Sequence, residues 1–277
     1  MSEKLQFPSV GEYGFKQELS SLREPRKDVK PKASRYVEIS RLYIESNSKE
    51  ANIVISNFVQ KFLMCDQVRI ACLGDSITAG YFESREKMHG IRSEVDAYPY
   101  KLKQMLNNVR KDCSVEIVNA GIGGNTAKDG LERLEKDVLC YQPDLVIVSF
   151  GANDVYHEKR CYLMSLKGIF TELNRRNIPA IFLAPAMFNT KVVSDILTDI
   201  AEKTAEMENA GVLADYFSSA VQLAIEYRIA VCDCYTRWKH LNALGVDTNQ
   251  LLANGINHPS RPVQTMIAFR LFDTIFY

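Results

Sequence analysis

From residue 68 onward, five short apolar segments alternate with longer stretches that have the spacing of amphipathic helices. Their residues are almost continuously apolar, which is typical of strands that are covered on both faces. Strands that alternate with helices form a parallel sheet with crossover connections. The pattern therefore predicts an α/β fold with a buried central sheet of five parallel strands. The five segments are VRIACLG (68–74), CSVEIVNA (113–120), DLVIVSFG (144–151), IPAIFLAP (178–185) and RIAVCD (228–233).

The stretches between and after these segments carry helix patterns. Apolar residues from Tyr162 to Leu173 recur at helical spacing, and a second such helix is expected from Pro262 to the C-terminus. The segment from about 190 to 228 is helical in pattern, and Gly211 predicts a break between two helices.

The composition limits the class of protein. A chain of 277 residues with 46% hydrophobic content can bury one large core or two small ones. Its 34 basic residues balance 34 acidic ones, so we expect neither nucleic acid nor a membrane as a partner. No apolar stretch approaches the roughly 20 residues that span a bilayer, and the N-terminus lacks the pattern of a secretion signal. The seven cysteines are odd in number and scattered, so we expect a cytoplasmic protein without disulfides.

Residues 1–66 differ from the rest of the chain. The sequence REPRKDVKPKASR is basic and contains two prolines, which is typical of a linker or an extended arm. The segments YVEISRLYIE and ANIVISNFVQKFLM then offer amphipathic material for two or three strands. We therefore divide the chain into an N-terminal extension (1–66), either an arm or a small β subdomain, and an α/β domain (67–277).

A candidate nucleophile follows the first predicted strand. In Gly74-Asp75-Ser76-Ile77-Thr78, a small residue allows a sharp turn that presents the Ser76 hydroxyl at the N-terminus of the next helix. The alternative is that Ser76 and Thr78 only cap that helix.

Two candidate groups for binding an oxyanion follow the second and third strands. The glycine-rich segment 119–126 (NAGIGGNT) exposes backbone N–H groups, and the amide of Asn153 in GAND (151–154) can donate in the same way. The glycine-rich segment lacks both the lysine of a P-loop and the spacing of a dinucleotide site. A flavodoxin-like nucleotide or flavin binder is the alternative, but we expect no cofactor.

His258 is the candidate general base. It lies in the turn NGINHP (254–259), just before the C-terminal helix, and is one of only four histidines. All these segments follow predicted strands, and the carboxyl ends of parallel strands gather the ligand site of such a sheet. We expect no metal site, because Cys232 and Cys234 form a C-x-C pair without further ligands nearby.

The segments GDSIT, GIGGNT, GAND and NHP, in that order, resemble the four blocks of the GDSL, or SGNH, hydrolase superfamily. The resemblance spans residues 68 to 277. It implies a flavodoxin-like three-layer α/β/α sandwich and ester hydrolysis by a serine nucleophile. It also implies that Ser76 is the nucleophile, that His258 is the base, and that Gly124, Asn153 and the Ser76 N–H form the oxyanion hole.

The sequence departs from this family at the acid of the triad. The family usually has an aspartate three residues before the histidine, where this chain has Gly255. Asp247 is the nearest upstream carboxylate and our candidate acid, and Asp233 is a second candidate. A Ser-His dyad oriented by a backbone carbonyl is the remaining alternative.

The resemblance also implies a substrate class. Small acyl esters, often acetyl groups on carbohydrates, are expected, so the predicted function is a short-chain esterase or carbohydrate deacetylase. A lipase or thioesterase is the alternative within the enzymes. If the protein is not an enzyme, the alternative is a non-catalytic glycan-binding module, in which the missing aspartate marks a decayed triad. The oligomeric state is not predicted.

Overall fold

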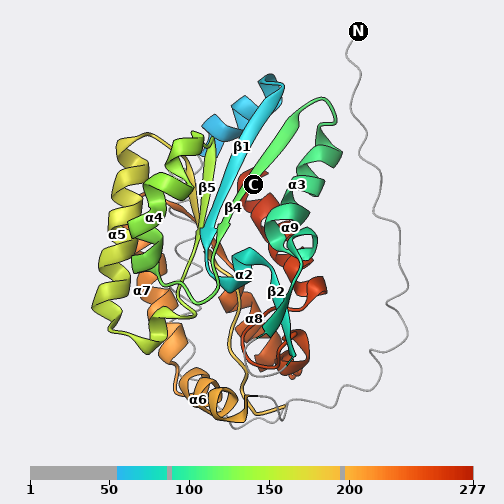
Figure 1. Ribbon diagram of the computed structural model, residues 1–277, viewed down its shortest axis with the longest axis vertical. Helices are drawn as coiled ribbons and strands as arrows, with labels where there is room; N and C mark the ends of the chain where they lie inside the picture. Colours follow the sequence, from blue (N-terminus) through green and yellow to red (C-terminus); the bar gives the residue numbers. More distant parts are fainter. Residues whose placement is uncertain (1–54, 86–88, 194–196, 277) are drawn as a thin grey trace.

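The computed structural model describes residues 55–85, 89–193 and 197–276. A five-stranded parallel sheet lies at the centre of this part of the chain (Figure 1). Its strands are β1 (Gln67–Gly74), β4 (Ser114–Gly121), β5 (Leu145–Ser149), β6 (Ala180–Ala184) and β7 (Ala230–Asp233). These are the five strands that the sequence predicts.

The strands are arranged in the order β4-β1-β5-β6-β7. Counted along the chain, this is 2-1-3-4-5, the doubly wound order of flavodoxin-like folds. Every residue of β5 and β6 is buried. This burial on both faces explains why these segments are continuously apolar.

Helices cover both faces of the sheet (Figure 1). The three-layer α/β/α sandwich that the family resemblance implies is therefore confirmed. One layer contains α4 (Ala127–Asp137), α5 (Lys159–Arg175) and α7 (Val212–Glu226). The other contains α3 (Tyr98–Val109) and α9 (Arg261–Phe276), which pack against each other.

The helical segment after β6 divides as the sequence predicts. Helix α6 (Thr198–Asn209) ends just before Gly211, which has a left-handed backbone with φ of 76°, and α7 begins at Val212. Glycine adopts this conformation without the steric cost of a Cβ atom. Helix α8 (Cys234–Ala243) follows β7, and the chain then reaches α9 through the loop that contains His258.

Residues 55–64 form a helix, not the strands that we proposed for this segment. Ile55, Phe58 and Phe62 are buried in the same core as the sheet, and the ring of Phe62 contacts that of Phe276 on α9. Their spacing of three and four residues is that of a helix face. Residues 1–54 lie outside the described residues, so the division at residue 66 stays a prediction.

The sequence pattern did not predict the small hairpin that follows the first strand. After the short helix α2 (Ser76–Ala79), β2 (Tyr81–Arg85) pairs antiparallel with β3 (His89–Arg92). The 3-10 turn η2 (Glu94–Asp96) then leads into α3. β2 and β3 contain no long apolar run and no clear alternation of apolar and polar residues. Their sequence pattern therefore did not indicate strands.

Close backbone contact fixes α2 against the end of β4. A Cβ atom on Gly121 would lie 2.3 Å from the backbone nitrogen of Ala79 and 2.7 Å from the carbonyl carbon of Thr78. A side chain here would push against main chain, which has little freedom to move. The glycine therefore sets how near the glycine-rich loop lies to α2.

We predict that Gly121→Ala lowers the free energy of unfolding by about 1–3 kcal/mol, because overpacking forces backbone shifts. Gly123→Ala is the matched control, since its Cβ atom would meet no atom closer than 3.6 Å. Urea-induced unfolding measures both variants. Equal stability of Gly121→Ala and Gly123→Ala would contradict the interpretation.

Candidate active site

Ser76 is the first residue of α2, directly after the sharp turn at the end of β1. The carboxylate of Asp75 caps this helix by accepting a hydrogen bond from the Ile77 N–H at 2.9 Å. The other three residues of α2 are buried, whereas Ser76 is partly exposed. The turn thus presents the hydroxyl of Ser76 outward while it anchors the residues around it.

Helix α9 holds α2 from the other side. The buried amide of Gln264 donates to the Ile77 carbonyl at 3.2 Å and accepts from the Tyr98 N–H at 2.9 Å. One side chain of α9 therefore connects α2 to the start of α3. Because α9 begins three residues after His258, the same helix fixes both halves of the site.

His258 and Ser76 are hydrogen-bonded although they are 182 residues apart. The Nε2 atom of His258 lies 3.0 Å from the Ser76 Oγ atom. The turn before the histidine is shaped by Asn254, whose Oδ1 atom accepts hydrogen bonds from the N–H groups of Ile256, Asn257 and His258. This Asx-type turn positions the imidazole.

The other ring nitrogen of His258 contacts the main chain of the hairpin. Its Nδ1 atom lies 3.0 Å from the carbonyl oxygen of Phe82. A carbonyl oxygen only accepts hydrogen bonds, so Nδ1 carries the proton in this contact. In the neutral ring, Nε2 is then the unprotonated nitrogen and faces the Ser76 hydroxyl as an acceptor.

Burial favours this neutral form. Desolvation lowers the pKa of His258 below its usual 6.5, and the hydrogen bond to the Phe82 carbonyl offsets part of that effect. At neutral pH the imidazole is therefore free to take a proton from Ser76.

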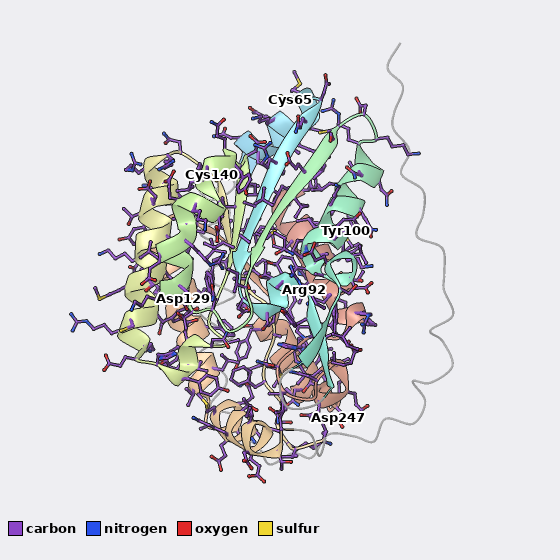
Figure 2. All side chains as sticks on the ribbon, viewed as in Figure 1. Cys65, Arg92, Tyr100, Asp129, Cys140 and Asp247 are labelled. Atoms are coloured by element: carbon purple, nitrogen blue, oxygen red, sulfur yellow. The ribbon has the colours of Figure 1, made fainter. Side chains whose placement is uncertain are left out.

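Asp247 does not occupy the position that we predicted for it. Its carboxylate forms an ion pair with Lys191 at 2.8 Å and accepts hydrogen bonds from Asn249, and these contacts lower its pKa to about 2. Figure 2 places Asp247 at the lower edge of the molecule, whereas α2 lies near its centre in the same view of Figure 1. The local turn at 247–249 keeps its carboxylate from reaching back to His258.

Asp233, the second candidate acid, is also occupied elsewhere. Its carboxylate caps α8 by accepting from the backbone N–H of Thr236 at 2.9 Å and from its hydroxyl at 2.6 Å. The group on the Nδ1 atom of His258 is thus a main-chain carbonyl, the third alternative left open by the sequence.

The glycine-rich loop lies beside Ser76. A Cβ atom on Gly123 would be 3.9 Å from the Ser76 Cβ atom and 3.6 Å from the Tyr81 ring. At Gly124 the backbone is left-handed, with φ of 80°, and a Cβ atom would have no neighbour within 4 Å. The main chain at Gly124 is therefore open to a ligand.

Asn153 is connected to the same loop. Its Nδ2 atom donates to the Asn125 carbonyl at 2.9 Å. This contact uses one of the two amide hydrogens and leaves the second for a ligand. The structure therefore brings Ser76, His258, the glycine-rich loop and Asn153 to the carboxyl end of the sheet.

The sequence analysis missed Arg133 of α4. Its guanidinium donates to the Gly74 carbonyl at 3.0 Å, the Ala120 carbonyl at 2.7 Å and the Asn125 Oδ1 atom at 2.8 Å. These contacts join the ends of β1 and β4 to the glycine-rich loop. The sequence offered no clear signal for this role, because an arginine on an amphipathic helix is usually exposed to solvent.

Two buried carboxyl groups lie beneath the site. Burial, together with the nearby charge of Asp154, raises the pKa of Asp75 to about 7, and burial raises that of Asp154 to about 6. The Oδ1 atom of Asp154 accepts from the Ala127 N–H at 2.9 Å. Asp154 therefore connects the loop after β5 to the first residue of α4.

Within residues 55–85, 89–193 and 197–276, no three or more side chains of the histidine, cysteine, aspartate and glutamate types are grouped as metal ligands. The described helices include none with the length and apolar character needed to cross a membrane.

Comparison with known proteins gives the family. The profile of the GDSL-like Lipase/Acylhydrolase family matches residues 72–263, which contain all four motifs. The chain belongs to this family. The resemblance predicted from Ser76, Gly124, Asn153 and His258 is therefore confirmed at the level of the family.

Individual relatives match shorter parts of the chain. An acetylxylan esterase of Geobacillus stearothermophilus is 29% identical over 104 residues, which cover 38% of this chain and 48% of that protein. An arylesterase of Vibrio mimicus is 35% identical over 86 residues, which cover 31% of this chain and 38% of that protein. The chain thus spans less than half the length of these two relatives.

A solved structure supports the fold. A two-domain esterase active on acetylated mannans superposes with a TM-score of 0.59 and 18% identity, covering 80% of this chain and 52% of that one. At this identity the likeness is evidence of the fold alone.

We predict that Asp247→Asn leaves kcat for ester hydrolysis within roughly threefold of wild type, whereas loss of a triad carboxylate costs about 10⁴-fold. The reason is that the Asp247 carboxylate contacts Lys191 and Asn249, while Phe82 occupies the Nδ1 side of His258. Steady-state hydrolysis of p-nitrophenyl acetate measures this. A loss of two orders of magnitude or more would restore Asp247 as the acid.

Proposed function

We propose that this chain is a serine ester hydrolase in which Ser76 forms an acyl-enzyme. One observation carries the proposal: the 3.0 Å hydrogen bond between the Ser76 hydroxyl and a histidine whose opposite nitrogen is held by a carbonyl. A nucleophile within hydrogen-bond reach of an oriented base is the arrangement that nucleophilic catalysis requires.

The first half of the reaction transfers the acyl group. The Nε2 atom of His258 takes the Ser76 proton while Oγ attacks the ester carbonyl carbon, forming a tetrahedral oxyanion. The bond from this carbon to the alcohol oxygen then breaks, and the imidazolium donates its proton to the departing alcohol. Water, activated by the same histidine, releases the acid and regenerates Ser76.

The oxyanion is held by three donors in this proposal: the N–H groups of Ser76 and Gly124, and the amide of Asn153. The support is the proximity of the glycine-rich loop to Ser76, the open backbone at Gly124 and the fixed orientation of the Asn153 amide. Donors that are held in place before the reaction lower the barrier because they need no reorganisation.

The non-catalytic glycan-binding module is less well supported. Loss of the triad aspartate would leave the Nδ1 atom of a decayed site without a partner. Here the Phe82 carbonyl takes that place, and Asn254 shapes the turn of the histidine. Binding of a glycan alone requires neither contact.

For the substrate, we propose small acyl esters, with acetyl esters of carbohydrates as the preferred class. The support is that an acetylxylan esterase is 29% identical to this chain over 104 residues, and that an esterase active on acetylated mannans has the same fold. Met187 and Phe188, which follow β6 near the carboxyl end of the sheet, are almost completely buried. They pack in the core, so they offer no wall for a long acyl chain.

Hydrolysis of p-nitrophenyl acetate, butyrate and octanoate tests the function. We expect wild type to turn over the acetate best, and Ser76→Ala and His258→Ala to lose at least about 10³-fold in kcat, because nucleophile and base act as a unit. Circular dichroism verifies that the variants are folded. Undiminished hydrolysis by Ser76→Ala would refute the mechanism, and preference for octanoate would favour the lipase alternative.

The pH dependence follows from the burial of His258. Its pKa lies below 6.5, and only the neutral imidazole accepts the Ser76 proton. We therefore expect kcat/KM to rise with pH through a midpoint below 6.5 and to be constant at neutral pH. A pH–rate profile of acetate ester hydrolysis measures this, and an acid limb centred above 6.5 would contradict a desolvated base.

A further inference from the structure

The carbonyl that orients His258 lies on the hairpin of β2 and β3, where the pairing of the two strands is irregular. The pairing of β2 with β3 shifts register between Tyr81 and Ser84, so Phe82 lies within the irregular part of the ladder. A β-bulge of this kind redirects the backbone locally. It frees the Phe82 carbonyl to accept from His258 instead of from β3, but it also removes the ladder that would hold it.

The base of the hairpin is fixed by the main chain. The Ser93 N–H donates to the Gly80 carbonyl at 2.8 Å, and the Arg92 guanidinium donates to the Ala79 carbonyl at 3.1 Å. Figure 2 places Arg92 beside α2. These contacts anchor Gly80 and the end of β3, and the Phe82 side chain is fully buried. The main chain of Phe82 and Glu83 lies where the regular strand pairing is interrupted.

Arg261 contacts both bulged residues. Its guanidinium lies 4.4 Å from the centre of the Phe82 ring and forms an ion pair with the Glu83 carboxylate. A second ion pair reaches Asp96 of η2 at 3.3 Å. Arg261 is the first residue of α9 and follows His258 by only three residues.

We infer that Arg261 is a positioning residue that holds the Phe82 carbonyl on the Nδ1 atom of His258. The inference rests on the proposed function, since it assigns a partner to the same Ser-His pair. The histidine turn and the hairpin are then joined by the His258–Phe82 hydrogen bond and, beyond it, by Arg261. Arg261 packs on the buried Phe82 ring while His258 binds the Phe82 carbonyl, so the two contacts hold both the side chain and the main chain of this residue.

The charges in this cluster suit the role. A guanidinium near the base would oppose formation of the imidazolium, but Glu83 and Asp96 balance the charge of Arg261. Arginine also fits the geometry better than lysine, because a planar guanidinium can stack on an aromatic ring while its N–H groups bind two carboxylates.

The test compares Arg261→Gln and Glu83→Gln with a matched control on the same helix. Arg270→Gln is that control, because Arg270 is also ion-paired on α9, with Asp273, and its side chain is similarly exposed, 36% against 38% for Arg261. Each variant is measured for kcat and KM on p-nitrophenyl acetate. The rate and the final stoichiometry of Ser76 labelling by a fluorophosphonate are recorded in parallel.

We expect Arg261→Gln to lower kcat and the labelling rate by about 10- to 100-fold, since small misplacements of reacting groups cost this much. KM and the final labelling stoichiometry stay at the wild-type level, because every molecule still folds and binds. Glu83→Gln lowers kcat and the labelling rate by a smaller factor. The double variant has the same kcat and labelling rate as Arg261→Gln, since the two side chains act through one contact. Arg270→Gln behaves as wild type.

The outcomes separate the two proposals. If wild type is neither labelled at Ser76 nor active on the ester, the proposed function is wrong, and this inference falls with it. If wild type reacts and Arg261→Gln matches Arg270→Gln, only the positioning role is overturned. A loss of stoichiometry with an unchanged labelling rate also overturns it, because that result marks a folding defect. If Arg261→Gln does not fold, the near-isosteric Glu83→Gln decides alone.

Discussion

The site depends on one geometric constraint: neighbouring parallel strands end at the same level of the sheet. Gly74 at the end of β1 is in register with Gly121 of β4 and with Ser149 of β5. Ser76, the glycine-rich loop and Asn153 follow these strand ends within a few residues. Three segments that are distant in the sequence therefore reach one edge of the sheet without any long connection.

Side chains from the surrounding helices turn this edge into a defined site. Arg133 joins the ends of β1 and β4 to the glycine-rich loop, and Gln264 joins α2 to α3. Both bind main-chain groups at the strand ends and in the turns that follow them. The same polar contacts therefore satisfy the buried backbone and hold the functional loops at their distances.

Replacing a carboxylate by a carbonyl changes the electrostatics of the base. The Phe82 carbonyl fixes the tautomer of His258 but brings no negative charge, and burial keeps the pKa of the imidazole low. In the proposed mechanism, the imidazolium would thus have weaker stabilisation than in a Ser-His-Asp triad. The same mechanism therefore assigns more of the catalysis to the proposed oxyanion donors and to the placement of the Phe82 carbonyl by the hairpin.

The sequence by itself determined the five strands, the layers of helices, the family and the segments that contain Ser76, Gly124, Asn153 and His258. Apolar periodicity and short motifs are local signals, so they can be read without coordinates. Only the tertiary structure decided what orients His258. A backbone carbonyl has no side-chain signature, and Phe82 lies 176 residues before the histidine on a hairpin without a clear pattern. For the same reason Asp247, the nearest carboxylate in sequence, was the wrong choice of partner, because its own turn and Lys191 hold it elsewhere.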